Sequence, residues 1–441
     1  MSKSKLIKLN NGATIIYNRN RANNYSAVTM GFLCGHKDNF KNGLAHFVEH
    51  MLMKETTSIS FDKMKEIKTE VCPRINACTG DDNICVEFER TNKLFEESFK
   101  LASDILLNPT FNEDIMKTER GVINEEYKLK LNKLNHLPEL FESQSITNDT
   151  TPEIALGTIE DLNNTTKEDL ISFKEKYFTS NNFILSYCGN LHLAKVKRLA
   201  NKYIIKHLKE DKSISFQPKC YKIIKGPNLF ICTNDDENLK IVISYKNDKL
   251  NIYERNMVKY DAMLNYLSKD KNLFHNELRS KGLVYFSNIR CQRFSDGSLV
   301  NLIIYTSKEK LYECLKIVNN SIRYVLNKKL PEKFISTYKN NIKYKEDECR
   351  PKVKIEIAYS NLNRYCRYKD IDVITKREYK KYVKDLTEND VQEAINEFFG
   401  NNAKPYITIM GNINESEVAS YDELCSILMN GTSRHSINKN N

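Results

Sequence analysis

The 441-residue sequence has no tryptophan, and no stretch approaches the roughly 20 uninterrupted apolar residues that a membrane helix needs. Its twelve cysteines form no C-x-x-C pair and no dense cluster, which favours reduced thiols in the cytoplasm over a disulfide framework. The N-terminus has lysines but lacks the apolar run of a secretory signal. We therefore expect a cytoplasmic chain that has no membrane partner.

Basic residues outnumber acidic ones by 68 to 57, which gives a net charge of +11. The lysines are spread among acidic residues along the whole chain, with no basic run of five or more. This distribution is typical of solvated faces, and the aromatic residues form no RNA-stacking pattern, so we expect no nucleic-acid partner. Apolar residues make up 40 % of the chain, enough for a packed core, and its length favours two or three domains.

Two segments far apart in the sequence, 166–191 and 387–413, follow one pattern. Each begins with Thr-x-x-Asp, continues with helical spacing, breaks at Asn-Asn, and ends in a β-rich run that stops at Gly-Asn. Thr-x-x-Asp can cap a helix N-terminus, and Gly-Asn favours a turn. The offset of 220 to 222 residues, half the chain, indicates an internal duplication.

A weaker repeat supports the duplication. Residues 95–126 and 311–346 each read as a helix, a proline break and a second helix. A strand pair with a polar turn precedes each of them, at 75–88 and 284–306. Strands followed by blocks of helices indicate an α+β fold rather than alternating parallel units.

We accordingly predict two homologous domains, each an antiparallel β-sheet with helices packed on one face. The first domain is expected at 1–207 and the second at 229–441, because the polar stretch 208–228 has the composition of a linker.

The most specific string in the sequence is His46-Phe-Val-Glu49-His50, set among apolar neighbours that suit a buried helix. Residues four apart share a helix face, so His46 and His50 can bind one metal ion side by side. Glu49 lies on the same side and is placed to act as a base toward the attacking water. This is the H-x-x-E-H order of the inverzincins. Catalytic zinc has three protein ligands, so a third should lie elsewhere.

Residues 112–126 carry several carboxylates on a second expected helix. Glu119 and Glu126 are seven residues apart, which is two helical turns, so both can face one site.

At these residues the chain resembles the pitrilysin/insulinase/mitochondrial-processing-peptidase family of zinc metallopeptidases, in its short two-domain branch. The matching blocks are 42–51, 75–79 and 119–126. The resemblance implies that one zinc ion per chain is held by His46, His50 and Glu126, with Glu119 as the carboxylate that supports this site. Glu125 is the competing candidate for third ligand, but it lies one residue off the face of Glu119.

Residues 273–285 resemble the segment in which an arginine and a tyrosine of the family contact the substrate backbone. The resemblance gives these roles to Arg279, which can hydrogen-bond a carbonyl, and Tyr285, which can stabilise an oxyanion. The second half has no H-x-x-E-H, and Lys345 falls roughly where Glu126 would repeat. We therefore expect a metal-free partner domain.

Asn76 and Ala77 open a strand that the family uses as a platform for an extended peptide. In this chain 72–74, Cys-Pro-Arg, replace the glycine pair that usually precedes this strand in the family.

The resemblance implies a zinc endopeptidase that hydrolyses peptides or unfolded segments inside a closed chamber, for general turnover or for maturation of a specific precursor. Because the chain has two such domains rather than four, we expect it to pair as a homodimer or as a heterodimer with a paralogue. The alternative is a non-catalytic peptide-binding or core subunit with the same fold.

Overall fold

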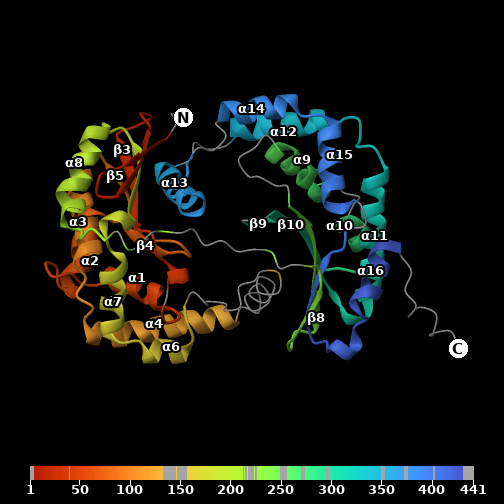
Figure 1. Cartoon of the computed structure of the whole chain (residues 1–441), viewed down its shortest axis with the longest axis horizontal. Coiled ribbons are helices and arrows are strands. Elements are labelled where there is room, and N and C mark those ends of the chain that lie inside the picture. The colour runs from red at the N-terminus through yellow and green to blue at the C-terminus, as the bar shows by residue number, and fades with distance from the viewer. Residues whose placement is uncertain are drawn as a thin grey trace. The chain divides into compact units, whose positions relative to one another are not determined.

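The computed structural model describes residues 4–38, 40–132, 146, 156–211, 213, 216, 223, 226–248, 256–269, 274–294, 297–348, 353–371, 376–400 and 403–430. The chain divides into two compact units, each built on its own β-sheet (Figure 1). The first unit holds the described residues up to 132, those from 156 to 216, and 353–371. The second unit holds the rest.

The first sheet has six strands in the order β1-β2-β6-β3-β5-β4. Their bounds are β1 Lys5–Lys8, β2 Thr14–Arg19, β3 Tyr25–Phe32, β4 Asn76–Thr79, β5 Ile84–Thr91 and β6 Phe183–Gly189. Neighbouring strands are antiparallel except β2 and β6, which are parallel. Strand β4 pairs only with β5 among the described strands, so it forms one edge of the sheet.

The helices of the first unit fall on both faces of this sheet, with α3 and α8 opposite α13 (Figure 1). The α-helices are α1 Leu44–Leu52, α2 Phe61–Val71, α3 Phe95–Leu107, α4 Glu113–Asn132, α6 Ile159–Asn164, α7 Lys167–Tyr177, α8 Leu193–Tyr203 and α13 Lys354–Tyr368. The 3-10 helices are η1 His36–Asp38, η2 Ser180–Asn182 and η3 Ile205–His207.

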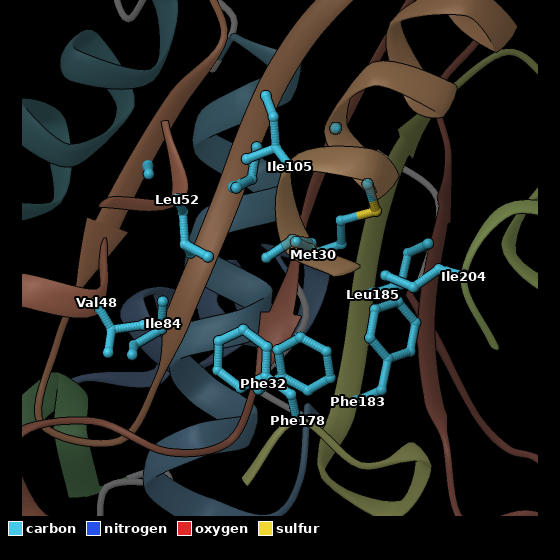
Figure 2. Close-up of a cluster of buried hydrophobic side chains, with 14 of the residues drawn as sticks. Met30, Phe32, Val48, Leu52, Ile84, Ile105, Phe178, Phe183, Leu185 and Ile204 are labelled. Carbon is cyan, nitrogen blue, oxygen red and sulfur yellow. The ribbon is translucent and has the colours of Figure 1, made fainter. Parts of the chain in front are cut away.

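The main core of the first unit lies between one face of the sheet and the helices α1, α3 and α8. Figure 2 shows Phe32 stacked on Phe178, with ring centroids 4.0 Å apart, and Phe183 next to them. Val48 of α1 lies against Ile84 of β5 in the same cluster. Burying one such side chain contributes about 1.5–3 kcal/mol, so this contact fixes α1 to the sheet.

Helix α13 covers the opposite face of the first sheet, where its Leu362 and Tyr365 pack on Ile16 and Ile184. The Lys354 ammonium at its start donates to the Tyr25 carbonyl at 2.5 Å. The sequence pattern placed this helix within the 229–441 domain and expected helices on one face only. The structure instead packs α13 on the first sheet, because its apolar side chains match the otherwise bare apolar face.

The second sheet has five strands in the order β7-β11-β8-β10-β9. The strands are β7 Leu229–Thr233, β8 Asn238–Asn247, β9 Phe286–Phe294, β10 Gly297–Ser307 and β11 Tyr406–Gly411. The helices are α9 Asn256–Lys269, α10 His275–Ser280, η4 Lys308–Lys310, α11 Leu311–Asn327, α12 Phe334–Glu348, α14 Lys376–Asp385, α15 Glu388–Phe399, η5 Glu415–Glu417 and α16 Tyr421–Asn430.

The two sheets share one topology. Strands β2, β6, β3, β5 and β4 occupy the positions of β7, β11, β8, β10 and β9, and β7 and β11 are again the parallel pair. The α+β fold is therefore confirmed, although each sheet includes one parallel pair that the sequence pattern did not indicate.

The helix caps predicted from the repeat are also present. Thr166 accepts a hydrogen bond from the Asp169 amide, and Thr387 accepts one from the Asp390 amide, with the reciprocal bonds formed in both cases. The strands that follow end at Gly189 and Gly411, as expected.

Most of the expected linker 208–228 and the second Asn-Asn break at 401–402 lie outside the described residues. Within the described part of the chain, no helix combines the length and the apolar composition that a membrane crossing requires.

Candidate metal centre

Helix α1 begins at a glycine that the local backbone requires. Gly43 has φ of 75°, and a Cβ there would lie 2.3 Å from the carbonyl oxygen of Leu156. Only glycine combines the left-handed conformation with so close an approach. The chain can therefore turn into α1 directly beside residues 156–157.

The sequence of α1 separates an apolar face from a polar one. Phe47, Val48 and the other apolar residues of this helix are buried, which places the polar residues on the opposite side. There the side chains of His46, Glu49 and His50 are only 12 %, 15 % and 18 % exposed. The packing of the helix thus keeps all three side chains largely shielded from solvent.

Glu126 of α4 completes a cluster of possible metal ligands. One Glu126 oxygen lies 3.8 Å from His46 Nε2 and 3.7 Å from His50 Nε2. Ligand atoms of His46, His50 and Glu126 all lie within 4.8 Å of one another. Ligands at about 2.0–2.1 Å from a tetrahedral zinc ion are about 3.4 Å apart, so a small inward movement of these side chains suits the ion. Two imidazoles and a carboxylate are also a ligand set that zinc takes in hydrolases.

Arg120 fixes α4 in this position, a contact that the sequence did not reveal. Its guanidinium donates to the carbonyl oxygens of Leu162, at 3.1 Å, and of Thr165. It also lies 5.8 Å from the ring centroid of Phe47 in α1.

Glu125 turns outward, with 68 % of its side chain exposed and an ion pair to Lys128. Glu126 is therefore the residue of this pair that faces α1.

Glu119 lies two helical turns before Glu126 on α4 and contacts His50. Its Oε2 lies 3.0 Å from His50 Nδ1, while Oε1 lies 2.6 Å from the Lys54 ammonium. Burial raises the pKa of Glu119, but these two partners outweigh it and hold that pKa below the usual range. An ionised Glu119 fixes the ring orientation of His50 and leaves Nε2 free to face Glu126. The sequence pattern did not single out Lys54, although its position four residues after His50 was a signal.

Glu49 is close to the cluster without being part of it. Its Oε2 lies 3.9 Å from His46 Nε2. Burial raises the pKa of Glu49, His50 opposes that shift, and the charge of Glu126 adds to it. A carboxyl at this place can accept a proton and release it again.

Strand β4 places Asn76 and Ala77 at the edge of the first sheet, next to α1. Asn76 is exposed and Ala77 is buried in the core. The outer side of β4 pairs with no described strand, so its backbone groups can pair with an extended chain.

Arg279 and Tyr285 come together in the second unit. Arg279 Nη1 donates to the Tyr285 carbonyl at 3.4 Å, and Tyr285 is 88 % exposed. Both line a cavity of about 300 Å³ between α10 and the edge strand β9. Leu273, the first residue of this sequence block, lies outside the described residues.

Comparisons with known proteins point to one family. Residues 14–158 match the sequence profile of "Insulinase (Peptidase family M16)", and residues 164–342 match that of "Peptidase M16 inactive domain". A Rickettsia felis protein named a zinc protease is 24 % identical over 333 residues, which cover 74 % of this chain and 79 % of that relative.

Solved structures share the fold. A protease from Helicobacter pylori superposes with a TM-score of 0.74 at 18 % identity, over 93 % of this chain and all of that one. A periplasmic protease from Escherichia coli gives a TM-score of 0.77 at 15 % identity, over 98 % of this chain and half of that one. The names of the relatives support a protease that uses zinc, and the two profile matches establish that the chain belongs to the insulinase family, peptidase family M16.

Proposed function

We propose that this chain is a zinc-dependent endopeptidase whose metal ligands are His46, His50 and Glu126. The observation that carries the proposal is the convergence of these three side chains on one point, with His50 oriented by Glu119. The chemistry supplied by a bound zinc ion is Lewis acidity, which polarises a carbonyl and lowers the pKa of water.

Glu49 is the general base of the proposed reaction. It takes a proton from the water that attacks the scissile carbonyl, and it passes this proton to the leaving amine. Its position beside the three proposed ligands, with Oε2 at 3.9 Å from His46 Nε2, suits both steps.

The substrate is proposed to bind as an extended strand along β4, where Asn76 and Ala77 lie. Backbone pairing of this kind accepts many sequences. The exposed Tyr285 hydroxyl is available to stabilise the oxyanion, and Arg279 can donate to a substrate carbonyl. We further propose that two chains, identical or paralogous, close around the substrate to form a chamber.

The ten described cysteines are free, which supports a reducing compartment such as the cytoplasm. Substrates in this proposal are peptides or unfolded segments, with a dedicated precursor peptide as the more specialised version.

The proposal is tested by replacing Glu49→Gln and mapping the cleavage of a peptide library by mass spectrometry. We expect kcat/KM to fall by about 10²- to 10⁴-fold while zinc content and melting temperature stay unchanged. Glu125→Gln is the matched control and should retain full activity, because that side chain is exposed and faces away. A zinc-loaded wild-type chain that cleaves nothing, alone or paired, would overturn the proposal and favour the non-catalytic subunit.

A further inference from the structure

We propose that Cys78 and Cys85 form a redox-sensitive thiol pair, which hydrogen peroxide oxidises to a disulfide across the edge of the first sheet. The two sulfur atoms lie 3.1 Å apart, and the residues are direct partners in the β4–β5 register. The pair takes no part in the proposed peptidase chemistry, so this inference stands independently of it.

The geometry requires little movement. A disulfide bond is about 2.05 Å long, so the sulfur atoms need to approach by about 1 Å. Residues directly opposite in an antiparallel pair have Cβ atoms roughly 4.5–5.5 Å apart, so a disulfide, with about 3.5–4.5 Å, draws the two strands together by about 1 Å. Strand β4 has four residues and one free edge among the described strands, and Gly80 donates to the Asn83 carbonyl at 2.8 Å in the connecting turn. The edge strand can therefore shift without breaking a second pairing.

The two thiols differ in exposure, which sets the order of the chemistry. Cys78 is half-buried, so a small oxidant reaches it, whereas Cys85 is fully buried. The hydrogen bond with Cys78 and burial together raise the pKa of Cys85 well above its ordinary value. Cys85 thus stays protonated while Cys78 reacts first.

The reaction balances with hydrogen peroxide as the two-electron oxidant. The Cys78 thiolate attacks one peroxide oxygen, the O–O bond breaks, and a sulfenic acid forms while the departing hydroxide takes up a proton to become water. The Cys85 sulfur then attacks the Cys78 sulfur, the S–O bond breaks, and the hydroxyl leaves as a second water with the Cys85 proton. A small thiol reverses the change by exchange.

Cys366 of α13 is the competing partner for Cys85, but Asn83 lies between them. The Cys85 thiol lies 3.5 Å from Asn83 Oδ1, and Asn83 Nδ2 lies 3.6 Å from the Cys366 sulfur. A Cys85–Cys366 bond would have to displace this amide, whereas a Cys78–Cys85 bond displaces nothing.

The test treats the folded, full-length protein with hydrogen peroxide, blocks the remaining thiols by alkylation, and maps disulfides by mass spectrometry. We expect a peptide linked through Cys78 and Cys85, loss of alkylation at both positions, and full recovery after dithiothreitol. Absence of that link while Cys78 is oxidised further to sulfinic acid would overturn the proposal, and so would a Cys85–Cys366 link.

Two variants sharpen the result. In Cys78→Ser, a change at a half-buried position, Cys85 should remain alkylatable after unfolding, because the residue that meets the oxidant is gone. Cys232→Ser is the matched control: Cys232 is also half-buried on an edge strand, β7 of the second sheet. This variant should form the Cys78–Cys85 link as the wild type does. Oxidation of Cys85 in Cys78→Ser to the same extent as in the wild type would contradict the assigned order.

Discussion

Helices α1 and α9 occupy equivalent places in the two units, since each follows the strand next to the parallel pair. On α1, His46, Glu49 and His50 form a polar face that looks toward α4. On α9, aromatic and apolar side chains such as Tyr260 and Met263 are buried in the core, as Phe47 and Val48 are on α1, but no group of possible metal ligands found among the described residues includes α9. One backbone framework thus occurs with and without a candidate metal site, and a few side chains decide which.

The helices opposite them show the same contrast. Helix α4 meets α1 through the His50–Glu119 contact and through Glu126. Helix α12 meets α9 through Tyr266 and Phe334, whose ring centroids are 5.1 Å apart. Aromatic packing joins the second helix pair directly, whereas the first pair leaves polar groups facing one another, an arrangement that could hold a metal ion.

The largest expected effect concerns the two cores. Phe47→Ala in the first unit and Phe398→Ala in the second each remove a fully buried ring, and each should lower the free energy of unfolding by about 3–5 kcal/mol. Only Phe47→Ala should also weaken zinc binding, because Phe47 lies on α1 under Arg120. Denaturant unfolding and zinc competition measure the two effects. An equal loss of zinc affinity in folded Phe398→Ala would contradict the assignment of zinc binding to the first unit.

Glu119→Gln tests the support of His50. It keeps the shape of the side chain but removes the charge that holds His50 and Lys54, so zinc affinity should fall about 10- to 100-fold. Competition with a chelating dye measures this change. Glu125→Gln on the same helix is the control. An unchanged zinc affinity in Glu119→Gln would show that Glu119 does not orient the ligand.

The two equivalent helix caps should contribute equally to the free energy of unfolding. Thr166→Ala and Thr387→Ala each remove one reciprocal capping box, and each should cost about 0.5–2 kcal/mol of stability. Urea unfolding of the two variants compares them directly. A loss confined to one variant would mean that the equivalent helices differ in how much they contribute to stability.

The smallest effect is a pH dependence in the second unit. Burial raises the pKa of Glu397, but the Tyr260 hydrogen bond and the Lys259 ammonium outweigh it, so the folded-state pKa lies below its ordinary value. The ionised carboxylate therefore stabilises the fold above the ordinary glutamate pKa of about 4.3, and this stabilisation is lost as the pH falls through the folded-state value.

Glu397→Gln should accordingly flatten the loss of stability in acid, measured by urea unfolding over a series of pH values. Glu393→Gln is the control, because Glu393 also pairs with Lys259 but is 62 % exposed and should change the profile little. If the free energy of unfolding of Glu397→Gln fell with decreasing pH as it does in the wild type, Glu397 would not be the source of this pH dependence.

Local patterns in the sequence were sufficient for the repeated helix–strand segments, for the helix and strand pairs between them, and for the duplication. Caps such as Thr166–Asp169 act within one turn, so they can be recognised without the fold. The same holds for His46 and His50, which one helix turn brings together. Contacts between distant segments could not be recognised in this way. Two examples are the packing of α13 on the first sheet and the hydrogen bonds from Arg120 to the carbonyls of residues 162 and 165. Both depend on tertiary structure that no local spacing encodes.

Zinc content tests the central claim most directly. The wild-type chain, dialysed against a weak chelator, should hold one zinc ion, and Glu126→Ala should lose it while remaining folded, since Glu126 is 35 % exposed. Glu125→Ala, one residue away on the same helix, should keep its zinc. Retention of zinc in Glu126→Ala, or its loss in Glu125→Ala, would contradict the proposed metal centre.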